Sequence, residues 1–111
     1  MQSILSDYPD IKFIFAHLGG CNKNLLSRFL DVTNDCPNLF LDLCVSVILR
    51  NTLAWLVERV PVKQILYGSD HPINEFSFQL GRVLYADIDD STKQNILWDN
   101  AARLFPYKAV L

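Results

Sequence analysis

The stretch Gln64–Pro72 reads QILYGSDHP, an apolar run that ends at a glycine and is followed by three polar residues and a proline. Such a run, bounded by turn residues, is typical of a strand buried on both faces, and we expect this strand over Ile65–Tyr67. In parallel α/β folds the carboxyl ends of the strands carry the functional site, because the loops leaving them converge at one edge of the sheet. Asp70 is therefore the first candidate for a functional residue.

Two other apolar runs have the same form. Ile11–Ala16 (IKFIFA) is followed by His17 and the pair Gly19–Gly20, and Leu39–Leu43 (LFLDL) contains Asp42. We expect the glycines to permit a tight turn or a close backbone approach. A carboxylate inside a buried strand needs a partner, so a structural hydrogen bond is favoured for Asp42 over a substrate contact.

Helical spacing of apolar residues marks the segments between and after these strands. The expected helices are a short tail at Met1–Ser6, Asn24–Asp35, a helix capped by Asn51 and ended by Pro61, Phe76–Ala86, and Ser91–Leu104. Strands separated by crossover helices imply parallel pairing with right-handed connections. The sequence therefore predicts an α/β fold with three parallel strands.

Local signals add detail to this pattern. Ser91 and Gln94 have the spacing of a capping box, in which each side chain satisfies a free backbone donor of the helix start. Trp55 and Trp98, which lie among apolar neighbours, are expected to be packing residues. Val45–Arg50 is apolar and β-branched without clear punctuation, and it fits neither class.

Composition narrows the function. The chain has 111 residues, half of them hydrophobic, and a net charge of −2, which is typical of one soluble globular domain over residues 1–111. Its Lys and Arg are scattered, so we expect no nucleic-acid partner. No apolar run approaches the roughly 20 residues of a membrane span, and no leader pattern is present, so we expect no membrane partner and a cytoplasmic protein. The irregular spacing of Cys21, Cys36 and Cys44 favours reduced thiols that pack as small hydrophobes.

Three segments together resemble a known family. Tyr8–Gly20 (YPDIKFIFAHLGG), Ile65–Pro72 (ILYGSDHP) and Asn100–Phe105 (NAARLF) have an order and spacing similar to the C-terminal portion of the amidohydrolase-2 family. These are metal-dependent TIM-barrel hydrolases and decarboxylases related to aminocarboxymuconate-semialdehyde decarboxylase. The resemblance covers essentially the whole chain. It implies a partial TIM (β/α)8 barrel whose three parallel units correspond to strands 6 to 8, followed by a C-terminal helix.

The resemblance also implies a site. By position, Asp70 corresponds to the aspartate that binds a divalent metal, usually zinc, and that can take the proton of the metal-bound water. His17 corresponds to the catalytic histidine that activates or orients this water. Strands 6 and 8 are two steps apart, about 9 to 10 Å, so both side chains could meet at one ion. The implied substrate is a small organic acid or amide.

The chain departs from the family in its histidines, since His17 and His71 are the only ones. The family's His-x-His pair on strand 1 and histidine on strand 5 have no counterpart here, and a catalytic zinc usually takes about three protein ligands. His71 is not expected to be a ligand beside Asp70, because adjacent residues of an extended backbone point to opposite sides. We therefore expect little or no metal binding and no activity from this chain alone, without a complementary barrel portion.

Two other classes of function remain open. The chain could be a non-enzymatic interaction or oligomerising protein derived from a truncated barrel, pairing its strand edges and apolar faces with a second copy or another chain. It could also be an unrelated small α/β domain that binds a phosphate or a small acid at the Gly19–Gly20 turn. For Arg103, a helix-surface or capping role is favoured over a substrate contact.

Overall fold

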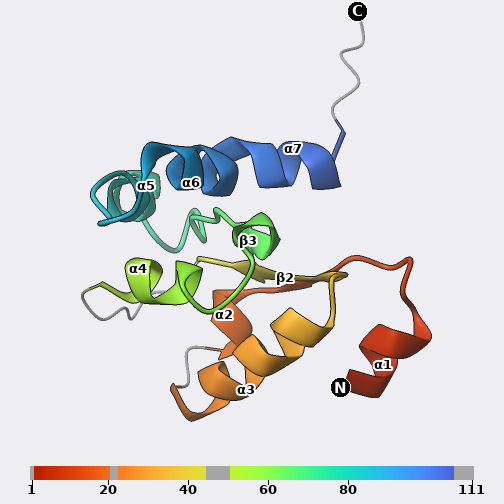
Figure 1. Ribbon diagram of the computed structural model, residues 1–111. Helices are drawn as coiled ribbons and strands as arrows, with labels where there is room; N and C mark the ends of the chain where they lie inside the picture. The colour runs from red at the N-terminus through yellow and green to blue at the C-terminus, as the bar shows by residue number, and fades with distance from the viewer. Residues whose placement is uncertain (1, 21–22, 45–50, 107–111) are drawn as a thin grey trace, which may run out of the picture.

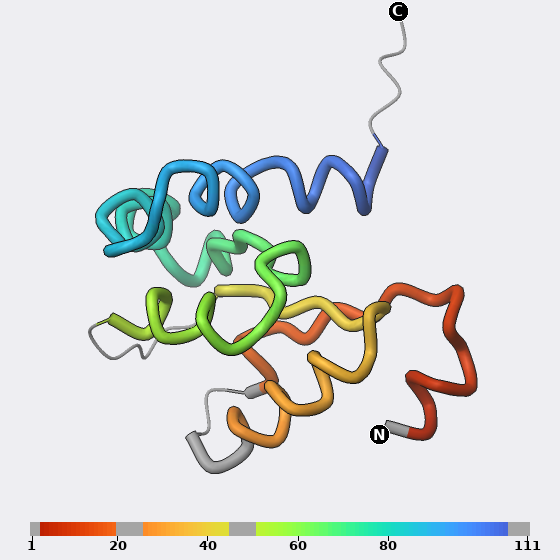
Figure 2. The backbone as a smooth tube through the Cα atoms, viewed as in Figure 1, coloured from red at the N-terminus to blue at the C-terminus, as the bar shows by residue number. Residues whose placement is uncertain are grey.

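The structure, a computed structural model, describes residues 2–20, 23–44 and 51–106. Within these ranges β1 (Phe13–Phe15), β2 (Leu39–Asp42) and β3 (Ile65–Leu66) form one parallel sheet in the order β1-β2-β3. Figure 2 shows the segments that carry β1 and β2 running side by side. The parallel α/β prediction is confirmed, although each strand is shorter than the apolar run that predicted it.

Helices cover both sides of this sheet. In Figure 1, α1, α2 and α3 lie on one side, and α5, α6 and α7 lie on the other. The helices are α1 (Gln2–Asp7), α2 (His17–Gly20), α3 (Lys23–Asp35), α4 (Thr52–Val57), α5 (Phe76–Leu84), α6 (Asp90–Gln94) and α7 (Asn100–Leu104), with a 3-10 turn η1 (Val62–Gln64) and a π-helical turn η2 (Asn95–Asp99). Among the helices of the described residues, none combines the length and the apolar composition of a transmembrane span.

The predicted helix Ser91–Leu104 is continuous from α6 through η2 to α7. Two sequence interpretations, the ambiguous Val45–Arg50 and the thiol of Cys21, lie outside the described residues.

The core forms where β2 and β3 meet the helices. Leu41 and Ile65, paired across the two strands, have no exposed surface and pack with Leu56 of α4 and Ile96 of η2. A smaller cluster joins Leu5 of α1 to the start of β2. Burial alternates along β2, because successive side chains of a strand point to opposite faces.

Two buried amides connect the amino ends of the strands to the preceding loops. Asn38 Nδ2 lies 3.0, 3.0 and 3.1 Å from the carbonyl oxygens of Leu5, Tyr8 and Ile11. Gln64 Nε2 lies 3.0, 3.0 and 2.7 Å from the carbonyl oxygens of residues 33, 36 and 39. Each amide has two N–H donors for three acceptors, so one donor is shared. No local feature of the sequence predicts either role.

The capping-box prediction is wrong. Asp89 caps α6, and its Oδ1 accepts the backbone N–H of Thr92 at 2.9 Å. The Ser91 hydroxyl donates to the same oxygen at 2.6 Å, so it supports the cap instead of forming one. Asn51 does precede α4, but its backbone is left-handed (φ 63°) and its side chain makes no capping hydrogen bond.

The packing role predicted for the tryptophans is wrong for Trp98, which is 66% exposed. Its neighbour Ile96 is buried, and a residue two positions along a helix points to nearly the opposite side. Trp55 is also exposed, at 37%, and the Arg59 guanidinium lies 4.5 Å from its ring centroid. Such an arrangement is a cation–π contact at the surface.

Candidate functional site

The first predicted site residue, His17, lies directly beyond β1 in a turn of left-handed backbone. The φ angles of His17, Leu18 and Gly19 are 55°, 52° and 84°. A Cβ atom at Gly19 would lie 2.4 Å from the Phe29 ring, so a larger residue would not fit. The prediction of a tight turn and close approach is confirmed at Gly19.

The His17 imidazole points toward the segment that follows β2. Its Nδ1 is hydrogen-bonded to the carbonyl oxygen of Cys44 and lies 3.8 Å from the Cys44 Sγ. A carbonyl oxygen only accepts, so Nδ1 carries the proton in this bond. In the neutral ring Nε2 then has a free lone pair, and His17 can accept a proton at that atom.

Asp42, the last residue of β2, holds the segment that follows this strand. Its Oδ1 accepts the backbone N–H of Cys44 at 2.9 Å, so the predicted structural hydrogen bond is confirmed. Gly68, just beyond β3, lies against the same carboxylate, and a Cβ atom there would be 2.0 Å from Oδ1. The ends of β2 and β3 therefore approach one another closely because residue 68 has no side chain.

The second predicted site residue, Asp70, also has left-handed backbone, with φ 61°. Its Oδ2 accepts the side-chain N–H of Asn74 at 3.0 Å, and its carbonyl accepts the backbone N–H groups of Ile73 and Asn74. These bonds form a turn that holds the carboxyl group half-buried near the end of β3. His71 is exposed, and its backbone N–H donates to the Ser69 hydroxyl at 3.3 Å.

Several of these residues affect the pKa of the Cys44 thiol. The pKa of Cys44 is raised to about 11, chiefly by burial; a hydrogen bond from the His17 backbone lowers it, and the hydrogen bond and charge of Asp42 and the charge of Asp70 raise it. Cys44 thus lies within the electrostatic reach of both aspartates. The prediction of free buried thiols is confirmed for Cys36 and Cys44.

Sequence reasoning missed Cys44 as a member of this group. The available signal was its place two residues after Asp42, at the carboxyl end of a strand.

A metal ion needs more donors than the described residues at the carboxyl ends of the strands provide. Among the described residues, no three His, Cys, Asp or Glu side chains are close enough together to hold a metal ion. A mononuclear catalytic zinc takes about three protein ligands. The described donors alone therefore do not fit a complete metal centre, and Asp70 can supply at most one part of it.

The parallel sheet and the residues at its carboxyl end indicate the class of fold. Parallel strands, covering helices, and polar side chains gathered where the strands end are features of barrel-type α/β folds. The amidohydrolase family matches residues 1–107. The chain belongs to the amidohydrolase family.

A curated relative is the 2-amino-3-carboxymuconate-6-semialdehyde decarboxylase of Caenorhabditis elegans. It is 27% identical over 120 aligned positions, which include 94% of this chain and 30% of the relative. The chain thus spans less than a third of that protein.

Solved structures show the same fold. A dihydroxybenzoic acid decarboxylase from a Polaromonas species, with bound manganese and the inhibitor 2-nitroresorcinol, has a TM-score of 0.73 at 21% identity, with 95% of this chain and 36% of that one covered. Amidohydrolase 2 from Bifidobacterium longum subsp. infantis has a TM-score of 0.71 at 19% identity, with 97% and 45% covered.

Proposed function

We propose that this chain forms one side of the active site of a metal-dependent hydrolase or decarboxylase, and that its three strands are barrel strands 6 to 8. In this proposal Asp70 is one ligand of a divalent metal, zinc in the family's usual site. His17 holds and moves a proton at Nε2. The remaining ligands come from a complementary barrel portion, and the chain alone is inactive.

The observation that carries the proposal is the backbone at the two predicted residues. Four described non-glycine residues have positive φ, and His17 and Asp70 are two of them. Left-handed backbone is costly for such residues and concentrates at functional sites. In this chain the left-handed residues His17 and Asp70 follow β1 and β3, at the carboxyl end of the parallel sheet.

The chemistry follows from what each group can do. A bound divalent metal would supply Lewis-acid polarisation of a carboxylate or carbonyl group. The bond to Cys44 fixes the ring of His17, so that Nε2 is the atom available for proton transfer. The buried Cys44 thiol, with its raised pKa, stays neutral near pH 7 and does not act as a nucleophile.

The substrate class proposed is a small organic acid. The names of two relatives describe decarboxylases of carboxylated compounds, an aminocarboxymuconate semialdehyde and a dihydroxybenzoic acid. A substrate of this kind presents a carboxylate that a metal can bind.

The test restores the missing part in trans. The chain is mixed with the portion of the Caenorhabditis elegans decarboxylase outside the matched region, and bound Zn²⁺ and carbon dioxide release from that enzyme's substrate are measured. We expect about one Zn²⁺ per complex, with affinity reduced at least tenfold by Asp70→Asn and unchanged by Asp87→Asn, a matched change at an exposed position. His17→Gln should abolish carbon dioxide release while Zn²⁺ is retained. Equal Zn²⁺ binding in the Asp70 and Asp87 variants would refute the assignment of the ligand.

A non-enzymatic interaction protein is the second candidate, and one observation favours it. In the described sheet β1 and β3 each pair on one side only, and Ile14 of β1 is 41% exposed. Unpaired strand edges with apolar side chains recruit other chains. Light scattering after size-exclusion chromatography should then show homo-oligomers at micromolar concentration, whereas a monomer over that range would exclude self-association as the function.

A further inference from the structure

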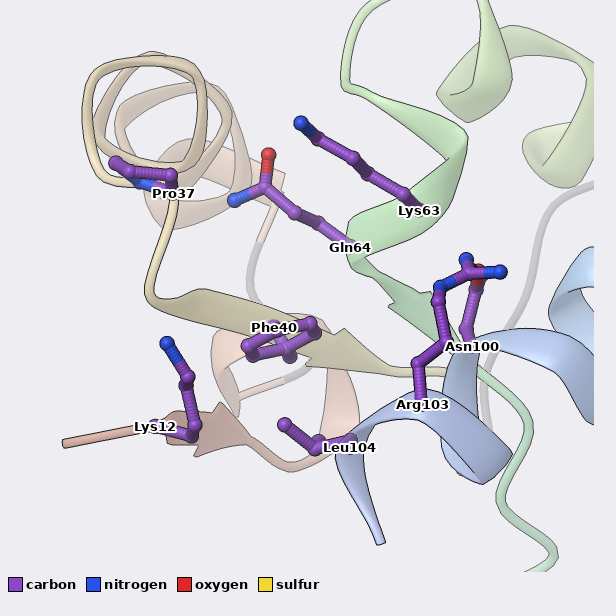
Figure 3. A pocket seen from close by; sticks show the side chains of 8 residues that line it. All are labelled: Lys12, Pro37, Phe40, Lys63, Gln64, Asn100, Arg103 and Leu104. Atoms are coloured by element: carbon purple, nitrogen blue, oxygen red, sulfur yellow. The ribbon is translucent and has the colours of Figure 1, made fainter. Parts of the chain in front are cut away.

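A cavity of about 210 Å³ lies at the end of the sheet opposite His17 and Asp70. Its cationic lining residues come from three parts of the chain: Lys12 precedes β1, Lys63 is in η1 just before β3, and Arg103 is on α7. Figure 3 shows these cationic side chains on different sides of Phe40, with their charged ends apart from one another. The cavity therefore lies at the amino ends of the strands and shares no residue with the proposed active site.

The charge of this cavity is one-sided. Three of its lining residues are cationic, and none is an aspartate or glutamate. The ion pairs found within the described ranges involve Arg59 and Lys93, and none of the three lining cations. Cations that have no protein counter-charge favour an anionic ligand, because the charge of the ligand offsets theirs.

Arg103 is held in position at this cavity. Its Nη2 donates to Asn100 Oδ1, and Asn100 is 1% exposed. Asn100 Nδ2 in turn lies 2.7 Å from the carbonyl oxygens of Val62 and Ile65. Arg103 is thus fixed through a buried amide to the start of β3, and its other N–H groups can bind an anion with little loss of side-chain freedom.

The remaining wall is apolar. Phe40 and Leu104 face the same space as the cations (Figure 3). The volume is below the roughly 300 to 1,000 Å³ of pockets for drug-sized ligands, so the occupant must be small. A ligand with one anionic group and a compact apolar body matches both parts of the lining.

We propose that this cavity is a binding site for a small organic anion, with the anionic group at the Arg103 guanidinium, Lys12 and Lys63 adding positive charge to the lining, and the apolar body against Phe40 and Leu104. The site is independent of the proposed active site, because it lies at the other end of the strands.

The test titrates benzoate into the 111-residue chain and follows thermal unfolding and heat of binding. Phosphate at matched ionic strength is the comparison, since it has the charge without the apolar body. We expect a saturable stabilisation by benzoate and a weaker one by phosphate. Lys63→Gln and Arg103→Gln should each weaken benzoate binding at least tenfold, and Arg28→Gln, an exposed position on α3, should leave it unchanged.

Lys63→Gln keeps the test decisive if Arg103→Gln fails to fold, because Lys63 is exposed. Asp70→Asn should not alter benzoate binding, so failure of the active-site proposal would leave this result intact. No saturable effect of benzoate, an equal effect of phosphate, or equal binding by the Lys63 and Arg28 variants would each overturn the proposal.

Discussion

The buried amide of Gln64 offers the sharpest test of what stabilises this sheet. Gln64 is 2% exposed, and its Nε2 lies 2.7 to 3.0 Å from three carbonyl oxygens, which lie between the last turn of α3 and the first residue of β2. Gln64→Leu keeps the approximate volume of the side chain but removes both N–H donors. The variant therefore tests the hydrogen bonds with little change in packing.

The expected cost follows from the partners that remain. The Cys36 carbonyl still accepts the Leu39 N–H at 3.0 Å, so the loss falls mainly on the carbonyls of Thr33 and Leu39. Each net hydrogen bond is worth about 1 kcal/mol, and a buried acceptor left unpaired costs about 1 to 3 kcal/mol. We expect Gln64→Leu to lower the free energy of unfolding by about 3 kcal/mol, a large share of the ~5 to 15 kcal/mol typical of a domain.

Urea unfolding followed by circular dichroism measures this change. With an m-value of about 1.5 kcal/mol/M, the midpoint should fall by about 2 M. Gln94→Leu is the matched control, because Gln94 is exposed and its amide lies 3.3 Å from the Asp99 carboxylate at the surface. The control should stay within about 0.5 kcal/mol of the parent chain. Equal losses in the two variants would refute the role assigned to Gln64.

Three further predictions concern single groups. In the same urea assay, Gly68→Ala should destabilise the fold by about 1 to 3 kcal/mol, because the new Cβ atom displaces the Asp42 carboxylate from its hydrogen bond with the Cys44 N–H. Gly81→Ala is the control; residue 81 has open space around it, so this change should stabilise α5 by up to about 1 kcal/mol. Alkylation of Cys44 by iodoacetamide, mapped by mass spectrometry, should be slow at pH 8 and its rate should rise with a midpoint near pH 11. Because folding raises the thiol pKa from 9.0, the protonated thiol contributes its full stability to the folded state below pH 9, and this contribution is lost as the pH rises toward 11. Hydrogen bonds from residues 91 and 92 hold the pKa of Asp89 below its usual value, so Asp89→Ala should lower the melting temperature at pH 7, and the difference should shrink as pH falls below about 4.

The strands and their polar ends could be predicted from sequence because both signals are local. An apolar run that stops at a glycine or at a polar residue marks the end of a buried strand, and this placed His17, Asp42 and Asp70 beyond or at the ends of β1, β2 and β3. The hydrogen bond of Asp42 was also predictable, since a carboxylate in a buried strand needs a donor. These inferences need no knowledge of distant residues.

The errors and omissions arose where the answer depends on distant partners or on competing neighbours. Asn38 and Gln64 are polar residues next to turns, where such side chains are usually exposed, and their acceptors lie 25 to 33 positions away in the chain. Ser91 was predicted to cap the last helix, but the Asp89 carboxylate, two residues earlier, accepts the backbone N–H of Thr92 instead. Trp98 follows two apolar residues, and one helix face cannot bury three in succession.

The two ends of the sheet have different physical roles. At the amino end, Asn38, Gln64 and Asn100 use their buried amides to bind backbone carbonyls, which stabilises the fold. At the carboxyl end, His17 and Asp70 are held in left-handed conformations, which cost stability, and the proposed function makes these two residues part of a site. Variants at the two ends should therefore have different effects. Gln64→Leu should lower the free energy of unfolding without changing the Zn²⁺ affinity of the folded complex, and Asp70→Asn should lower the Zn²⁺ affinity without changing the free energy of unfolding. A common effect on both quantities would show that the ends are energetically coupled and that this division of roles is wrong.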